Sequence, residues 1–127
     1  MFIKGYTINE KDIRLKYTRA LEKFVRSNIS YLKEPEFIFE VFQKRVKRTF
    51  EMLKKVPTIR LDSAYPMALE NYVNLVLGVL HVEDIKQEEK NIIKENLLKE
   101  ANLLHKEKNK TRYKKDKHKT KKFNDGY

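Results

Sequence analysis

The chain has 127 residues, enough for one domain with a single hydrophobic core. Its net charge is +11, and the absence of cysteine excludes disulfides, thiolate metal sites and cysteine nucleophiles. The opening MFIKGYTI has too short an apolar run for a signal sequence, and no run approaches the roughly 18 apolar residues of a membrane-spanning helix, so we expect a soluble cytoplasmic protein without a membrane span.

A first helix is predicted over residues 8–29. Ile13, Tyr17, Leu21 and Phe24 recur at the spacing that places side chains on one face of a helix. The opposite face is basic and holds Lys16, Arg19, Lys23 and Arg26. This helix should therefore pack by one side and present positive charge on the other.

A second helix is predicted over residues 35–55, because Pro35 suits a first helical turn and Pro57 ends the segment. Its apolar face is formed by Ile38, Phe42, Val46, Phe50 and Leu53. A separate basic arc is formed by Lys44, Lys47, Arg48, Lys54 and Lys55. That arc can contact phosphates, or it can be a solvent-facing surface with internal pairs such as Glu51 with Lys55. Both interpretations stay open.

Two further helices are predicted over residues 63–82 and 84–106. Residues 71–82 carry no formal charge when His81 is neutral, so this helix should be buried and His81 should be a hydrogen-bonded core residue rather than a metal ligand. The short connection favours an antiparallel hairpin, although a single bent helix also fits. The chain is thus expected to be all-α, with about four helices in a small bundle.

Beyond Leu104 the apolar periodicity ends and lysines dominate. Residues 105–127 carry ten Lys and Arg against three Asp and Glu, a net charge of +7 that leaves +4 for residues 1–104. We predict a helical domain over residues 1–104 and a basic tail over residues 105–127 that is flexible when free. Cations on flexible stems bind phosphates, and an interleaved aromatic can stack on an exposed base. The candidate nucleic-acid-binding residues here are Lys106, Lys108, Lys110, Arg112, Tyr113, Lys114, Lys115, Lys117, Lys119, Lys121 and Lys122.

The stretch TIRLDSAYPMALENYVNLVLG resembles the ribbon-helix-helix DNA-binding fold, in which a short strand precedes two helices. The resemblance covers roughly residues 58–104. It implies that paired strands from two subunits enter the major groove, with Thr58, Arg60 and Asp62 directed toward bases. Alternatively, residues 58–62, in which apolar and polar residues alternate, are a plain linker between two helices.

No catalytic, metal or cofactor site is predicted. Arg112 and His118 bracket five residues, a spacing similar to the arginine–histidine motif of HEPN-type ribonucleases, which implies cleavage of RNA without a metal. In a lysine run the same spacing also arises by chance. The histidines have no paired ligand spacing with carboxylates, and the glycines are too scattered for a phosphate-binding loop. We therefore expect a protein that is not an enzyme.

Taken in order of preference, these patterns predict a non-enzymatic nucleic-acid-binding or nucleoprotein-assembly protein. Its contacts would be electrostatic and not strongly sequence-specific, and the sequence does not distinguish RNA from DNA as the ligand. One alternative is a small helical adaptor or structural subunit with a protein partner or a second copy, whose basic tail docks on an acidic surface. Another is that the lysine run is only a solvated tail.

Overall fold

The computed structural model describes residues 10–123, with side chains up to residue 110. The described chain forms four α-helices and no strand, which confirms the predicted all-α bundle. The helices are α1 (Glu10–Leu32), α2 (Phe39–Leu53), α3 (Ala64–Leu77) and α4 (Gln87–Phe123), with a 3₁₀ turn, η1, over Gly78–His81.

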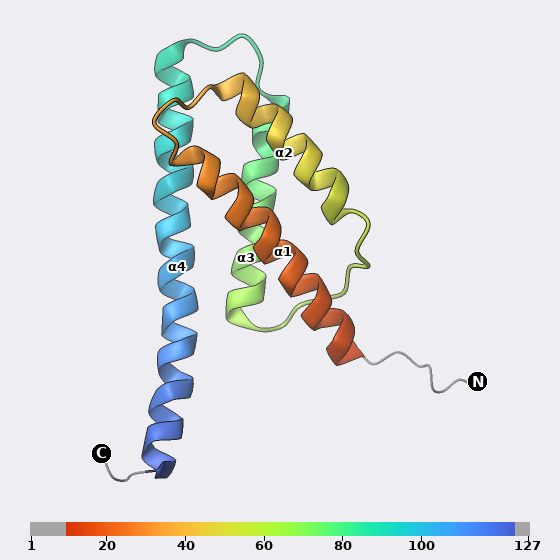
Figure 1. The fold of residues 1–127 in the computed structure, drawn as a ribbon, viewed down its shortest axis with the longest axis vertical. Helices are drawn as coiled ribbons and strands as arrows, with labels where there is room; N and C mark the ends of the chain where they lie inside the picture. Colours follow the sequence, from red (N-terminus) through yellow and green to blue (C-terminus); the bar gives the residue numbers. More distant parts are fainter. Residues whose placement is uncertain (1–9, 124–127) are drawn as a thin grey trace, which may run out of the picture.

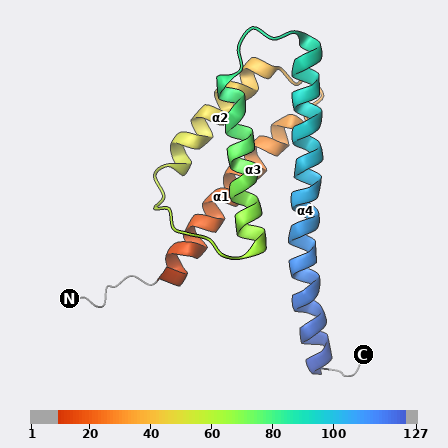
Figure 2. The ribbon, with the colours of Figure 1, turned by 180° about the vertical axis from the view of Figure 1, so that it is seen from behind.

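The helices form two layers. α1 and α2 are an antiparallel pair that lies in front in Figure 1, and α3 and α4 are a second antiparallel pair that lies in front when the molecule is turned around in Figure 2. The core fills the space between the layers with side chains from all four helices; its fully buried members include Leu21, Leu32, Phe42, Val46, Leu69 and Val76. Apolar residues that recur every three to four positions thus place one face of each helix inward.

An aromatic cluster fixes the turn between α1 and α2. Phe37 lies just before the helix cap Ile38, and its ring centre is 5.5 Å from that of Phe42 in the first turn of α2. Such a contact across a helix start is a hydrophobic staple. The Tyr31 hydroxyl also accepts a hydrogen bond from the Ile38 backbone N–H at 3.3 Å. These contacts explain why α2 begins at Phe39 and not at residue 35 as predicted.

The α1–α2 contact contains a polar seam. Arg45 donates hydrogen bonds to the Ser27 backbone carbonyl at 3.2 Å and to its hydroxyl at 3.1 Å. Asn28 is fully buried and donates to the Phe24 carbonyl and to Thr49 Oγ1, at 2.9 and 3.0 Å. Directional bonds of this kind fix the register of two packed helices, because a slip would leave buried donors unsatisfied.

The segment between α2 and α3 is an extended link over residues 57–62. Leu61 is buried and Ile59 half-buried, whereas Thr58, Arg60 and Asp62 are exposed, so the predicted alternation is observed. The strand that the ribbon-helix-helix resemblance implies is not formed by these residues. The link packs its apolar side chains on the core of its own chain.

α3 and α4 form a helical hairpin and not one bent helix. The link between them, residues 82–86, contains Asp84 with φ 50°, a left-handed conformation that aspartate tolerates better than most residues. The Glu89 carboxylate accepts the Lys86 backbone N–H at 3.1 Å, which caps the start of α4. The prediction that His81 is a core residue is wrong, because its side chain is exposed at the end of η1.

α4 continues past the boundary predicted at residue 106 and ends at Phe123. Figures 1 and 2 show that its C-terminal part extends beyond the other helices. Lysine is a good helix former, so the loss of apolar periodicity after Leu104 marks the last buried residue among the described side chains and not the end of the helix. We call residues 111–123 the α4 arm. Its predicted flexibility in the free protein stays a prediction, and residues 124–127 lie outside the described chain.

Two buried tyrosines connect α3 to other helices through their hydroxyls, one across the two layers and one within the α3–α4 layer. Tyr17 of α1 donates to Glu70 Oε2 of α3 at 2.5 Å, and Tyr72 of α3 donates to the Leu97 carbonyl of α4 at 2.9 Å. Burial, and then the hydrogen bond to Glu70, raises the pKa of Tyr17 from 10.0 to about 12. Burial, and then the charge of Glu100, raises the pKa of Tyr72 as well.

These tyrosines predict a loss of stability in alkaline solution. Their folded-state pKa values are above the unfolded value near 10, so the unfolded chain releases protons first as the pH rises. For Tyr17 the stabilisation is complete below pH 10 and is lost between pH 10 and about 12, at up to about 1.4 kcal/mol per pH unit, and Tyr72 adds a loss in the same direction. Urea unfolding at several pH values measures this slope, and Tyr17→Phe should make it shallower; an identical slope in the variant would contradict the assignment.

Candidate nucleic-acid interface

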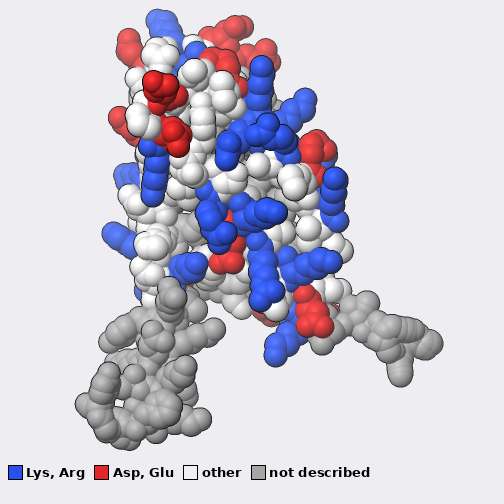
Figure 3. Space-filling model, viewed as in Figure 1, with Lys and Arg blue, Asp and Glu red and all other residues white. Residues whose placement is uncertain are grey.

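Charge is divided between the two layers. Residues 10–55, which form α1 and α2, contain thirteen Lys and Arg against seven Asp and Glu, whereas residues 64–107 contain five against eight. Figure 3 has the same view as Figure 1, and it shows Lys and Arg side chains gathered over the middle of the α1–α2 layer. This layer is therefore the basic side of the described chain, and its field favours a polyanion.

Four of its cations come from α1. Lys16, Arg19, Lys23 and Arg26 are exposed on the side of the helix opposite its buried residues. None of the four has a carboxylate oxygen within 4.0 Å among the described side chains. Their charge is thus available to a ligand from solution.

All five cations predicted on α2 are exposed as well. Glu51 pairs with Lys54 at 3.2 Å and not with Lys55 as predicted, and the Lys54 ammonium also lies 5.3 Å from the centre of the Phe50 ring. Lys44, Lys47, Arg48 and Lys55 have no carboxylate oxygen within 4.0 Å among the described side chains. We call these four cations and the four of α1 the basic face.

Glu40 and Glu51 are the two carboxylates that lie near the α2 lysines, and Glu40 forms a long-range ion pair. Lys90 of α4 lies 2.6 Å from Glu40 Oε2, and this hydrogen bond lowers the pKa of Glu40. Glu51 is occupied by Lys54. Both acidic residues that share the arc with the α2 lysines are therefore already paired.

The candidate residues on α4 fall into three groups. Lys106 and Lys110 are exposed. Lys108 is half-buried, because its ammonium lies 3.8 Å from Glu22 and 5.9 Å from the centre of the Tyr65 ring. The candidates from Arg112 to Lys122, Tyr113 among them, follow on the α4 arm, where the backbone is helical and the side chains lie outside the described set.

A pocket of about 400 Å³ lies where α1, α3 and α4 meet, and we call it the α1–α4 pocket. Its apolar lining consists of Val25, Ile29, Leu69, Ala101 and Leu104. Its polar lining consists of Glu22, Arg26, Ser30, Lys33, Tyr65, His105 and Lys108. Arg26 belongs to the basic face, and Lys108 lies one helical turn before the α4 arm begins, so the pocket separates the two basic parts of the molecule.

Tyr65 and Glu22 form the centre of the polar lining. The Tyr65 hydroxyl donates to Glu22 Oε2 at 2.8 Å, and burial, followed by this bond to Glu22, raises the pKa of Tyr65. Glu22 thus interacts with both Tyr65 and Lys108. No carboxylate oxygen within 4.0 Å pairs with Arg26 or Lys33 among the described side chains.

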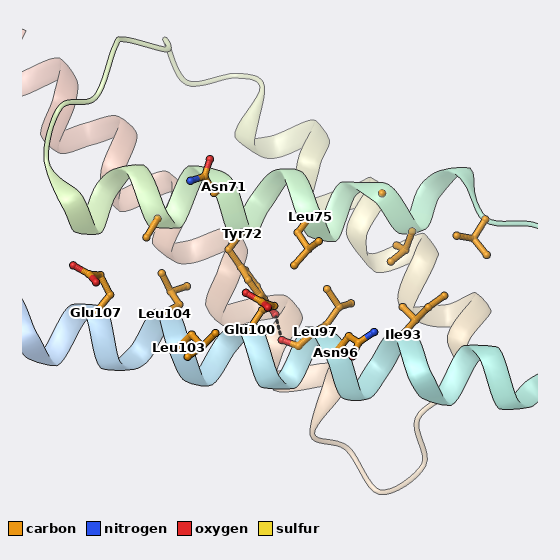
Figure 4. Close-up of a pocket in the computed structure, with 14 residues that line it drawn as sticks. Asn71, Tyr72, Leu75, Ile93, Asn96, Leu97, Glu100, Leu103, Leu104 and Glu107 are labelled. Atoms are coloured by element: carbon orange, nitrogen blue, oxygen red, sulfur yellow. Dashed lines mark hydrogen bonds between the residues drawn. The ribbon is translucent and has the colours of Figure 1, made fainter.

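A larger hollow of about 830 Å³ runs between α3 and α4, and we call it the α3–α4 groove. Figure 4 shows Leu75 of α3 facing Leu97 of α4 across it, with Leu103 on the rim; Leu75 and Leu103 are 47% and 50% exposed. Its charged lining residues are Glu100 and Glu107, and no lysine or arginine contributes. The groove is apolar with an acidic edge, unlike the basic face.

Other classes of site are not found in the part of the chain that the structure describes. No group of three or more His, Asp or Glu side chains there could hold a metal ion. Nor is any of the described helices both long and apolar enough to cross a membrane. Arg112 and His118 lie on the α4 arm, so the spacing that resembles a ribonuclease motif stays untested.

Comparison with known proteins returns nothing: no family model, curated protein or solved structure matches this chain. Support for a nucleic-acid interface therefore comes from the geometry and charge of the described residues alone. The sequence indicated a basic side of the first helix, but only the fold shows that this side lies beside the basic arc of α2. Tyr65 was not predicted as a site residue, and no sequence signal places it near Arg26 and Lys108.

Proposed function

We propose that the protein binds nucleic acid without cleaving it and acts in nucleoprotein assembly. The observation that carries this proposal is the basic face, in which two helices present eight unpaired cations on one side of the described chain. The α4 arm adds seven Lys and Arg against one Asp. Lys and Arg contacts to phosphates carry no base information, so the binding is electrostatic and not strongly sequence-specific.

Binding measured across a salt series tests this proposal. Five phosphate contacts would give a slope of log K against log salt near −4.5 on duplex and near −3.5 on single strands. A mixed pool of labelled oligonucleotides, with fluorescence anisotropy as the readout, measures both slopes on the full-length protein. Absent binding, or binding that salt does not weaken, would overturn the proposal.

A helical adaptor or structural subunit is the second candidate, and the α3–α4 groove favours it. A groove with apolar walls and acidic edges suits a helix that carries a cation beside its apolar anchors. α2 presents such a stripe in Val41, Arg48 and Met52, all exposed and spaced along one side of the helix. The occupant proposed for the groove is therefore α2 of a second copy, while the basic tail docks on an acidic partner.

Sedimentation over a wide range of protein concentrations tests this second candidate. The wild-type protein should associate, and Leu103→Lys in the groove should prevent association. Leu15→Lys is the matched control, because Leu15 is equally exposed on α1 but outside the groove. A protein that stays monomeric at every concentration would exclude the second copy as the occupant.

A further inference from the structure

The α1–α4 pocket combines features that suit one nucleotide unit of a single strand. Its volume of about 400 Å³ falls in the range of small-molecule pockets, roughly 300–1,000 Å³. Five aliphatic side chains line it, and Tyr65 supplies an aromatic ring. A nucleobase has two flat π-faces that stack on aromatic rings whatever the base, so an apolar pocket with a tyrosine accepts any of them.

The ring of Tyr65 is held in place before any ligand arrives. Its hydroxyl donates to Glu22 at 2.8 Å, and the side chain is half-buried between α1 and α4. Lys108 lies 5.9 Å from the ring centre at the mouth, with its side chain 43% exposed. A stacked base needs a fixed ring, and a partly exposed lysine can turn from Glu22 to a phosphate without disturbing the core.

The charges at the pocket place the phosphate next to the base. Glu22 is shared by Tyr65 and Lys108, which leaves Arg26 and Lys33 without a carboxylate partner among the described side chains. Both are exposed, and both line the pocket from α1. An anion attached to the buried base would therefore find two free cations at the rim, one of them in the basic face.

We propose that the α1–α4 pocket receives one unstacked base of a single-stranded nucleic acid, with the adjoining phosphate held by Arg26 and Lys33. This inference rests on the proposed function and makes it more specific. The bases of a duplex are stacked and paired, so they cannot enter without being flipped out, whereas a single strand offers them freely. The strand then continues from the pocket onto the basic face on one side and toward the α4 arm on the other.

A single-stranded oligonucleotide that contains the fluorescent base 2-aminopurine tests the pocket in the full-length protein. When the protein is added, stacking on Tyr65 should quench the fluorescence of this base further in the single strand, whereas in a duplex, where neighbouring bases already quench it, the protein should cause no further change. Tyr65→Leu should abolish quenching and weaken single-strand binding by roughly 5- to 150-fold, while duplex binding stays as in the wild type. Tyr65→Phe keeps the ring and should retain the quenching.

Two further variants keep the test decisive if Tyr65→Leu does not fold. Ser30→Phe fills the pocket from an exposed position on α1 and should weaken single-strand binding in the same selective way. Arg26→Gln should weaken single-strand binding more than Arg19→Gln does. Arg19 is the matched control, since it lies two helical turns earlier on the same side of α1 and outside the pocket.

The outcomes separate this inference from the proposed function. If the wild-type protein binds neither polymer, the proposed function fails and the pocket proposal with it. If both polymers bind but quenching is absent, and Tyr65→Leu and Ser30→Phe change nothing, only the pocket proposal is overturned. Adenosine monophosphate that binds more tightly than the oligonucleotide would assign the pocket to a free nucleotide and would also overturn it.

Discussion

Replacing Phe42 with alanine is expected to lower the free energy of unfolding by about 3–5 kcal/mol. Phe42 is fully buried, and its ring centre lies 6.3 Å from that of Tyr31 and 5.5 Å from that of Phe37. The substitution removes the aromatic contact that joins α1, the turn and α2, and it leaves a cavity that helices cannot close. Because small domains are stable by only about 5–15 kcal/mol, urea unfolding followed by circular dichroism should show the loss clearly.

Val41→Ala is the matched control for this prediction. Val41 is the preceding residue on the same helix, but it is 43% exposed and faces away from the core. Its replacement should change the free energy of unfolding by no more than about 0.5 kcal/mol, as is usual for surface positions. Equal losses in the two variants would mean that the burial pattern of α2 is wrong.

The sequence predicted the inward face of α2 well because helical periodicity alone determines it. Phe42, Val46 and Leu53 are buried as expected. Ile38, also predicted inward, is 52% exposed, since the helix starts at Phe39 instead of residue 35 and Ile38 becomes its cap. The start of the helix depends on the contact of Phe37 with Phe42, which a periodicity argument does not contain.

The end of α4, in contrast, could not be predicted from helical periodicity. Apolar periodicity correctly located Leu104, the last fully packed apolar residue among the described side chains. It could not locate the end of the helix, because lysine favours helix without needing a packing partner. A helix boundary and a packing boundary coincide only where a glycine, a proline or a cap ends both.

The candidate site was predictable in its charges but not in its pairing. The sequence shows which helix sides are basic, yet the partners of Glu40 and Glu22 lie 50 and 86 residues away, on α4. Only tertiary contacts decide that Lys90 and Lys108 are engaged while Lys44 and Arg48 stay free among the described residues. The sequence therefore gives the sign of the charge on each helix side, and the fold determines which of the cations are paired.

Replacing the six lysines of the α4 arm with glutamine is expected to give the largest effect on binding. The variant carries glutamine at Lys114, Lys115, Lys117, Lys119, Lys121 and Lys122. If each lysine neutralises one phosphate, the slope of log K against log salt on single strands should become shallower by up to about 4. Near physiological salt the affinity should fall by roughly two to three orders of magnitude. Glutamine is neutral and has a helix propensity close to that of lysine, so the change removes charge and preserves the helix.

Two matched variants show which surface carries the slope. Lys86→Gln with Lys99→Gln removes two lysines from the acidic layer, where no phosphate contact is proposed, and should leave the slope unchanged. Lys23→Gln with Arg48→Gln removes two cations of the basic face and should make it shallower by about 1.4 on single strands. If the arm variant keeps the wild-type slope while the basic-face variant does not, the strand stays on α1 and α2 and the arm is a solvated extension. Losses from both that add independently would mean that one strand contacts both surfaces at once, since distant sites contribute additively.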